Sequence, residues 1–124
     1  MNTIEINSLV LAYLGDTIYE NYVRLFLIKK GINHVQKLQE ESLNYVSAKS
    51  QSRILRELIN KNVFSNEELN IIKRARNSKT NSHPKNTDII TYKEATGLEA
   101  LFGYLKLKNN IERIEELMNL ILNS

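Results

Sequence analysis

Three acidic residues stand in stretches of the sequence that are otherwise apolar or made of small residues. Asp16 and Glu20 lie one helical turn apart in a segment whose spacing predicts a helix that is apolar around much of its circumference. Glu99 lies in a second such stretch, between two glycines. A carboxylate on a buried helix is costly unless a positive charge compensates it. The pattern therefore predicts either ion pairs with Lys or Arg of another helix, or a site that holds a cation.

The residue types favour a hard divalent cation over zinc. The chain has no cysteine, and its two histidines, His34 and His83, have no second ligand at the usual spacing. The sequence contains no Ser-His-Asp set, P-loop or glycine-rich dinucleotide motif. Carboxylate oxygens and water are the ligands that Mg²⁺ and Mn²⁺ prefer. We therefore expect Mg²⁺ at Asp16 and Glu99, with Mn²⁺ as a substitute.

Basic residues are concentrated in one segment of the chain. Residues 73–93 contain six Lys or Arg and one acid, whereas the whole chain has a net charge of +3. The rest of the chain is therefore slightly acidic. A concentrated basic segment is typical of proteins that bind the phosphate backbone of nucleic acids. The alternative is a solvated loop in a chain that is rich in Lys throughout.

The spacing of apolar residues predicts an all-α protein, a single domain of about six or seven helices. One proline and four glycines leave little turn chemistry for a sheet. Capping boxes are expected at Ser65 with Glu68 and at Thr91 with Glu94. The predicted helices cover residues 8–30, 33–39, 41–60, 66–76, 91–107 and 111–122. The long irregular segment 77–90 has a length that is often functional.

No targeting or membrane-spanning segment is predicted. The N-terminal residues lack the basic stretch and long apolar run of a secretory signal. No apolar run approaches the roughly 20 residues that cross a bilayer. The lack of cysteine fits a reducing compartment. We expect a cytoplasmic protein without a membrane partner.

The two segments that carry the acids resemble the signature motifs of the ribonuclease III family. Residues 11–20, LAYLGDTIYE, resemble its signature helix, and residues 96–103, TGLEALFG, resemble its second acidic motif. Together with the basic stretch, the pattern is similar to the Mini-III subfamily, a ribonuclease III catalytic domain without a double-stranded-RNA-binding domain. Ala12 and Thr96 replace acids of the ordinary ribonuclease III motifs, as in Mini-III. The resemblance thus assigns Asp16 and Glu99 as catalytic metal ligands, with Glu20 as a further candidate ligand.

This resemblance implies a Mg²⁺-dependent endoribonuclease that cleaves double-stranded RNA as a homodimer, with one active site per subunit. It also implies a role in the maturation of large-subunit ribosomal RNA, with assistance from a ribosomal protein left open. Tyr13 occupies the position of an aromatic residue that family members press into a pocket of the partner subunit. We expect Tyr13 and Leu14 at the dimer interface; the alternative is that they pack within their own subunit.

The basic segment is the predicted grip on RNA, because the catalytic domain itself must hold the duplex. Candidate contacts to phosphates and ribose hydroxyls are Arg74, Arg76, Asn77, Ser78, Lys79, Lys85 and Asn86.

Two other classes of function stay open. A non-catalytic RNA-binding or ribosome-assembly module on the same fold would explain Ala12 and Thr96 as decay of the site. A helical interaction protein would leave the acids and the basic segment unexplained.

Overall fold

The computed structural model describes residues 6–78, 85 and 87–123, and these residues form six helices without a strand. The all-α prediction is therefore confirmed. The helices are α1 (Ser8–Lys29), α2 (Val35–Val46), α3 (Ala48–Asn60), α4 (Asn66–Arg76), α5 (Ile89–Leu107) and α6 (Ile111–Leu122). None of the helices in this described part combines the length and the apolar character needed to cross a membrane.

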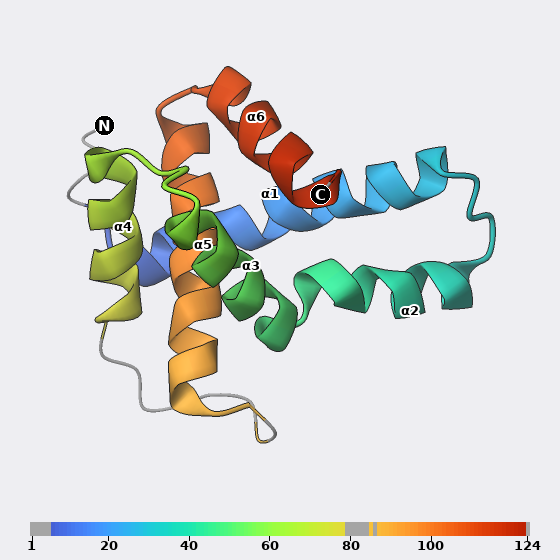
Figure 1. Ribbon diagram of the computed structural model, residues 1–124, viewed down its shortest axis with the longest axis horizontal. Helices are drawn as coiled ribbons and strands as arrows, with labels where there is room; N and C mark the ends of the chain where they lie inside the picture. The colour runs from blue at the N-terminus through green and yellow to red at the C-terminus, as the bar shows by residue number, and fades with distance from the viewer. Residues whose placement is uncertain (1–5, 79–84, 86, 124) are drawn as a thin grey trace.

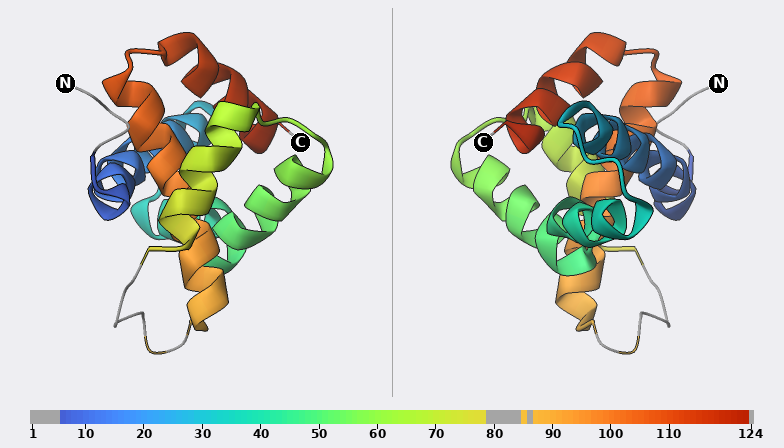
Figure 2. Two further views of the ribbon diagram at one scale, coloured as in Figure 1. Left: turned by 90° about the vertical axis from the view of Figure 1, so that its left-hand side faces the viewer. Right: turned by 90° about the vertical axis from the view of Figure 1, so that its right-hand side faces the viewer.

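Helices α1 and α5 form the centre of the molecule and cross one another (Figure 1). Helix α2 runs back along α1, while α3 and α4 pack against α5 (Figure 2). Helix α6 closes the arrangement by contacting both central helices. Each central helix therefore has neighbours on several sides, which explains part of the apolar circumference of α1. Some apolar residues of α1, among them Val10 and Tyr13, remain exposed.

Two glycines allow the backbones of α1 and α5 to touch. A Cβ atom on Gly15 would lie 1.7 Å from the carbonyl oxygen of Glu99. A Cβ atom on Gly103 would lie 1.9 Å from the carbonyl oxygen of Leu11. Glycine costs about 1 kcal/mol inside a helix relative to alanine, and here that cost is offset by the close packing it permits. The contact fixes the register in which residue 16 of α1 meets residue 99 of α5.

The core beside this crossing is built on Tyr19, which is fully buried. Its ring meets the ring of Phe102 edge to face, with centroids 5.6 Å apart. Its hydroxyl donates a hydrogen bond of 2.8 Å to the carbonyl of Tyr45. Because Tyr45 lies near the end of α2, this hydrogen bond ties that helix to the central pair.

The prediction of one helix over residues 41–60 is wrong. The chain breaks at Ser47, which has an extended conformation and caps the N-terminus of α3. Its hydroxyl accepts a hydrogen bond from the Ser50 amide. The preceding helix, predicted over residues 33–39, continues to Val46. The apolar spacing hides this break because Val46 before it and Ile54 after it both pack in or against the core.

Of the two predicted capping boxes, one is confirmed and one is wrong. Ser65 and Glu68 exchange hydrogen bonds at the start of α4. Helix α5, however, begins at Ile89 and is capped by Asp88, whose carboxylate accepts a hydrogen bond from the Thr91 amide. Glu94, the expected partner of Thr91, is turned away into a buried contact with α3 instead.

Candidate active site

The crossing of α1 and α5 brings Asp16 and Glu99 together. Gly15, the neighbour of Asp16, lies directly on the backbone of Glu99. The Asp16 carboxyl lies close enough to Glu99 to favour a proton on Glu99. Asp16 is exposed to solvent, whereas Glu99 is half-buried below it. The predicted pair is therefore one site with one open side.

Burial is the main cause of a large shift at Glu99 and raises the pKa of its carboxyl to about 9. The closeness and the negative charge of Asp16 raise this pKa further, and Glu20 adds a smaller effect. The nearby side-chain amide of Gln51 acts in the opposite direction and lowers the pKa. Without a cation, Glu99 is therefore held in its protonated form at neutral pH.

No ion pair of Asp16 or Glu99 occurs within the described part of the chain. Glu20 is half-buried and pairs with Arg24 of its own helix, at 3.5 Å. Compensation by a Lys or Arg of another helix, the alternative to a cation site, is therefore not found at these three acids among the residues that the structure describes. It is found at Glu94, which accepts a 2.6 Å hydrogen bond from Arg56.

The donor set fits one hard divalent cation. No cluster of three or more His, Cys, Asp or Glu side chains with metal-holding geometry is found among the described residues. Mg²⁺, however, typically takes one or two carboxylates and completes its shell with water and substrate phosphate. Asp16 and Glu99 supply that number, and the open side leaves room for the other ligands. The place of Glu20 as a metal ligand stays a prediction.

The two residues that replace acids of ordinary ribonuclease III do not add ligands. Thr96 is buried, and its hydroxyl donates to the carbonyl of Tyr92 at 2.9 Å. Ala12 is buried in the hydrophobic core. Asp16 and Glu99 therefore stay the predicted ligands of the site.

Arg74, one of the predicted RNA contacts, has a role within the fold. It is half-buried, and its guanidinium donates to the hydroxyl of Ser8 at 3.0 Å and to the carbonyl of Ile6 at 3.1 Å. These bonds hold the first residues of α1 against α4. A contact of the same guanidinium with RNA stays a prediction, but it would compete with this anchoring.

The other described residues of the predicted RNA grip lie at the end of α4 and before α5. Asn77 and Lys85 are exposed, whereas Arg76 and Ser78 are half-buried. Arg76 lies near enough to Glu94 to lower the pKa of that carboxyl. Lys79 and Asn86 fall outside the described residues. The structure therefore leaves the RNA contacts of this segment as predictions.

The start of α1 presents an apolar surface to solvent. Tyr13 is 81% exposed and Val10 is 55% exposed, and these residues lie one turn apart on the same helix. Leu14 is half-buried. The ring of Tyr13 is therefore not covered by the described residues of its own subunit. The place of Tyr13 and Leu14 at a dimer interface stays a prediction.

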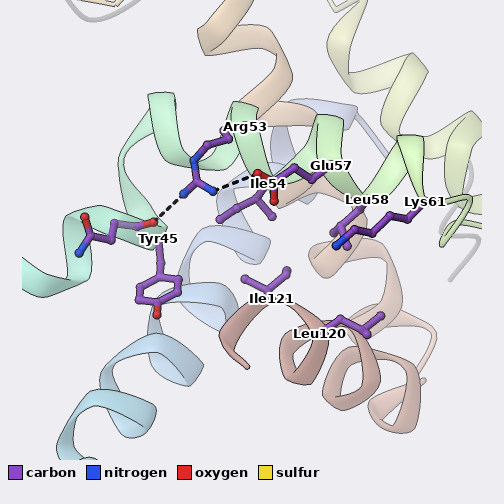
Figure 3. A pocket seen from close by; sticks show the side chains of 9 residues that line it. Tyr45, Arg53, Ile54, Glu57, Leu58, Lys61, Leu120 and Ile121 are labelled. Carbon is purple, nitrogen blue, oxygen red and sulfur yellow. Dashed lines mark hydrogen bonds and ion pairs between the residues drawn. The ribbon is translucent and has the colours of Figure 1, made fainter. Parts of the chain in front are cut away.

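A hollow of about 190 Å³ lies elsewhere, between α3 and the end of α6 (Figure 3). Arg53 at its edge donates to the carbonyl of Asn44 and to the carboxylate of Glu57, each at 3.3 Å. Ile54, Leu58 and Ile121 form its apolar wall. Neither acid of the candidate site lines it, so this hollow is not part of the active site.

Comparison with known proteins places the chain in a family. A model of the ribonuclease III domain matches residues 9–110, a range that includes Asp16 and Glu99. The chain is 41% identical to a Mini-ribonuclease 3 of Streptococcus pneumoniae, over 92% of this chain and 89% of that protein. The chain belongs to the Mini-ribonuclease III branch of the ribonuclease III family.

Further relatives agree in sequence and in fold. A Mini-ribonuclease 3 of Brevibacillus brevis is 47% identical over 90% of this chain and 82% of that protein. The crystal structure of a protein from Fusobacterium nucleatum matches the whole of both chains with a TM-score of 0.89, at 34% identity. The six helices described above are therefore arranged as in a solved protein.

Gln51, a residue that lies near Glu99, was not singled out from the sequence. Gln51 lies in a stripe of α3 that otherwise consists of Ile54, Leu55 and Leu58, and all four side chains are buried. A polar residue in an apolar stripe is a signal that can be seen in the sequence. The identity of the carboxyl that it faces, Glu99, depends on how α3 packs on α5.

Proposed function

We propose that the chain hydrolyses double-stranded RNA with a divalent cation held by Asp16 and Glu99, and that it matures large-subunit ribosomal RNA. Family membership makes the chain an endoribonuclease that acts on double-stranded RNA. The observation that supports the cation is the pair of facing carboxyls without a positive partner in the described part of the chain. Two neighbouring carboxyls can both ionise when a divalent cation balances their charge.

The two acids have different tasks in this proposal. When bound, a divalent cation supplies a Lewis acid that activates water and stabilises charge on the scissile phosphate. Asp16, at the open side, offers a carboxylate next to the substrate. Glu99 lies on α5 and is half-buried, so it would hold the cation on the side away from solvent. Because burial disfavours its charged form, Glu99 has a strong preference for its carboxylate only when positive charge is present.

The RNA contact is assigned to the segment that joins α4 to α5. Lys85 and Asn77 are exposed there, and the segment leads directly into the helix that carries Glu99. A-form RNA offers phosphates and ribose hydroxyls rather than a readable groove, so charge and shape suit its recognition. Arg76, Ser78, Lys79 and Asn86 complete the proposed set. Such binding weakens as salt rises.

We assign the exposed apolar start of α1 to a two-fold dimer interface. Tyr13 and Val10 would be covered by the same surface of a second copy. Sedimentation at micromolar concentration is expected to give twice the mass of the 14.4 kDa chain. A species of 14.4 kDa under these conditions would exclude the dimer.

A cleavage assay on duplex RNA tests the central proposal. The parent is expected to cut with Mg²⁺ and to stop when Mg²⁺ is chelated. Asp16→Asn and Glu99→Gln keep the shape but remove charge, and each should slow cleavage by about 10²–10³-fold or more. Glu112→Gln, the same type of change on an exposed acid of α6, should cleave like the parent.

Near-normal turnover of both site variants would contradict the metal site. A parent that binds duplex RNA without cutting it would favour the non-catalytic RNA-binding module. The proposed role in ribosomal RNA maturation is tested by comparing cleavage of two substrates. One is the base-paired stem of a large-subunit precursor, and the other is an unrelated duplex of equal length. Equal cleavage of the two substrates would argue against a dedicated role in ribosomal RNA maturation.

A further inference from the structure

Gln51 is the polar member of a buried stripe on α3. Its residue exposure is 3%, and its neighbours in the stripe, Ile54, Leu55 and Leu58, belong to the hydrophobic core. The next residue, Ser52, is also buried but is satisfied by a 3.1 Å hydrogen bond to Glu94. The burial of Ser52 is thus accounted for by its hydrogen bond, whereas the burial of Gln51 needs an explanation.

The amide nitrogen of Gln51 is buried without a hydrogen-bond partner among the described residues. An unpaired buried polar group destabilises the folded state, and an apolar residue of similar size would avoid this cost. Helix α3 packs on α5, and the Gln51 side chain lies near enough to the Glu99 carboxyl to lower the pKa of that group, although its amide nitrogen makes no hydrogen bond there. The unpaired donor thus lies near the deeper acid of the candidate site.

We propose that Gln51 is a positioning residue, whose amide donates to the Glu99 carboxylate and orients it toward a bound divalent cation. This proposal rests on the proposed function. A carboxylate that binds a cation through one oxygen has its other oxygen free to accept a hydrogen bond. Such outer hydrogen bonds fix the orientation of a ligand and typically change metal affinity by about 10–100-fold.

The neutrality of Gln51 is essential to this role. Arg56, on the same helix, neutralises Glu94 and leaves that carboxylate without any need for a metal. A glutamine donates a hydrogen bond but brings no charge, so the negative charge of Glu99 stays available for the cation. Helix α3 therefore supplies a positive partner to one acid of α5 and a neutral donor to the other.

Binding of Mn²⁺ alone, measured by electron paramagnetic resonance without RNA, tests this proposal. Gln51→Met keeps length and volume but removes the donor, so the Kd for Mn²⁺ should rise by about 10–100-fold. Ser52→Ala removes the adjacent buried hydroxyl and should bind Mn²⁺ like the parent. The Tm of metal-free Gln51→Met should equal or exceed that of the parent, because an unpaired buried amide has been removed.

Cleavage gives a second measurement. The Mg²⁺ concentration for half-maximal rate should rise in Gln51→Met, while the rate at saturating Mg²⁺ returns toward that of the parent. If Gln51→Met does not fold, Gln51→Leu tests the same donor with a branched side chain. Equal Mn²⁺ affinity of the parent and a folded variant would overturn the role of Gln51 and leave the metal site standing. A parent that binds no Mn²⁺ would instead overturn the metal site itself.

Discussion

Two glutamates on α5 are both screened from solvent, yet their surroundings drive them to opposite charge states. Glu94 accepts hydrogen bonds from Arg56 at 2.6 Å and from Ser52 at 3.1 Å, and hydrogen bonding to Arg56 is the main reason that its pKa is lowered. Glu99, five residues later, faces Asp16, and burial raises its pKa to about 9. One helix thus carries a compensated carboxylate and an uncompensated carboxyl.

The difference shows that burial alone does not determine what a carboxyl does. Helix α3 contacts both residues, but it offers Arg56 and Ser52 to Glu94 and Gln51 to Glu99. The ion pair of Glu94 holds α3 against α5. Glu99 lacks such a partner among the described residues, and its unfavourable charge is what makes the site suited to a cation.

The largest effect on stability is expected when Glu94 loses its ion-pair partner Arg56. Arg56→Met would leave Glu94 charged and buried without its partner, since water reaches Arg56 but not the carboxylate. The Tm should fall by several degrees in thermal unfolding followed by circular dichroism. Mn²⁺ affinity should be unchanged, because Glu94 is not a metal ligand.

Arg53→Met is the matched control on the same helix. Arg53 pairs with Glu57 at the surface, at 3.3 Å, with both side chains about half exposed. Exposed pairs of this type contribute about 0–1 kcal/mol. Equal losses of Tm in the two variants would show that the pair of Glu94 is no more important than a surface pair.

A smaller change in Tm, in the opposite direction, is expected when Glu99 is replaced. In the unfolded chain Glu99 ionises near its ordinary pKa of 4.5, whereas the folded chain retains the proton up to about pH 9. The folded state therefore loses stability as pH rises between these values. Glu99→Gln removes this loss, so its metal-free Tm should match the parent at pH 4 and exceed it by a few degrees at pH 8.

Glu94→Gln provides the comparison for this variant. It replaces a carboxylate that is favoured in the folded state, so its Tm at pH 8 should lie below that of the parent. A Glu99→Gln variant that is destabilised at pH 8, or shifted equally at pH 4 and pH 8, would contradict the assigned protonation of Glu99.

Features of the fold that depend on neighbouring residues could be predicted from the sequence. The cap of α4 by Ser65 and Glu68 is local, and so are the bounds of α6. The break at Ser47 was missed, because the apolar spacing continues through it while the capping hydroxyl leaves only a weak signal. Glu94 was misplaced because its partner Arg56 is 38 residues away along the chain.

In the candidate site, too, local features could be predicted from the sequence and long-range contacts could not. Asp16 and Glu99 could be chosen because they stand in apolar helices and resemble family motifs, but their meeting depends on the contact of Gly15 with α5. The anchoring of Arg74 on Ser8 spans 66 residues and could not be inferred from charge. Charge patterning identifies a basic segment but does not show which guanidinium the fold itself uses.

The contrast between Glu94 and Glu99 is tested most directly by carbon-13 NMR of the glutamate carboxyl groups across a pH series. In the metal-free chain, we expect the Glu99 carboxyl to titrate near pH 9 and the Glu94 carboxyl to titrate below 4.5. Addition of Mg²⁺ at pH 7 should convert Glu99 to its carboxylate and leave Glu94 unchanged. A Glu99 carboxyl that titrates near 4.5 and does not respond to Mg²⁺ would contradict the account.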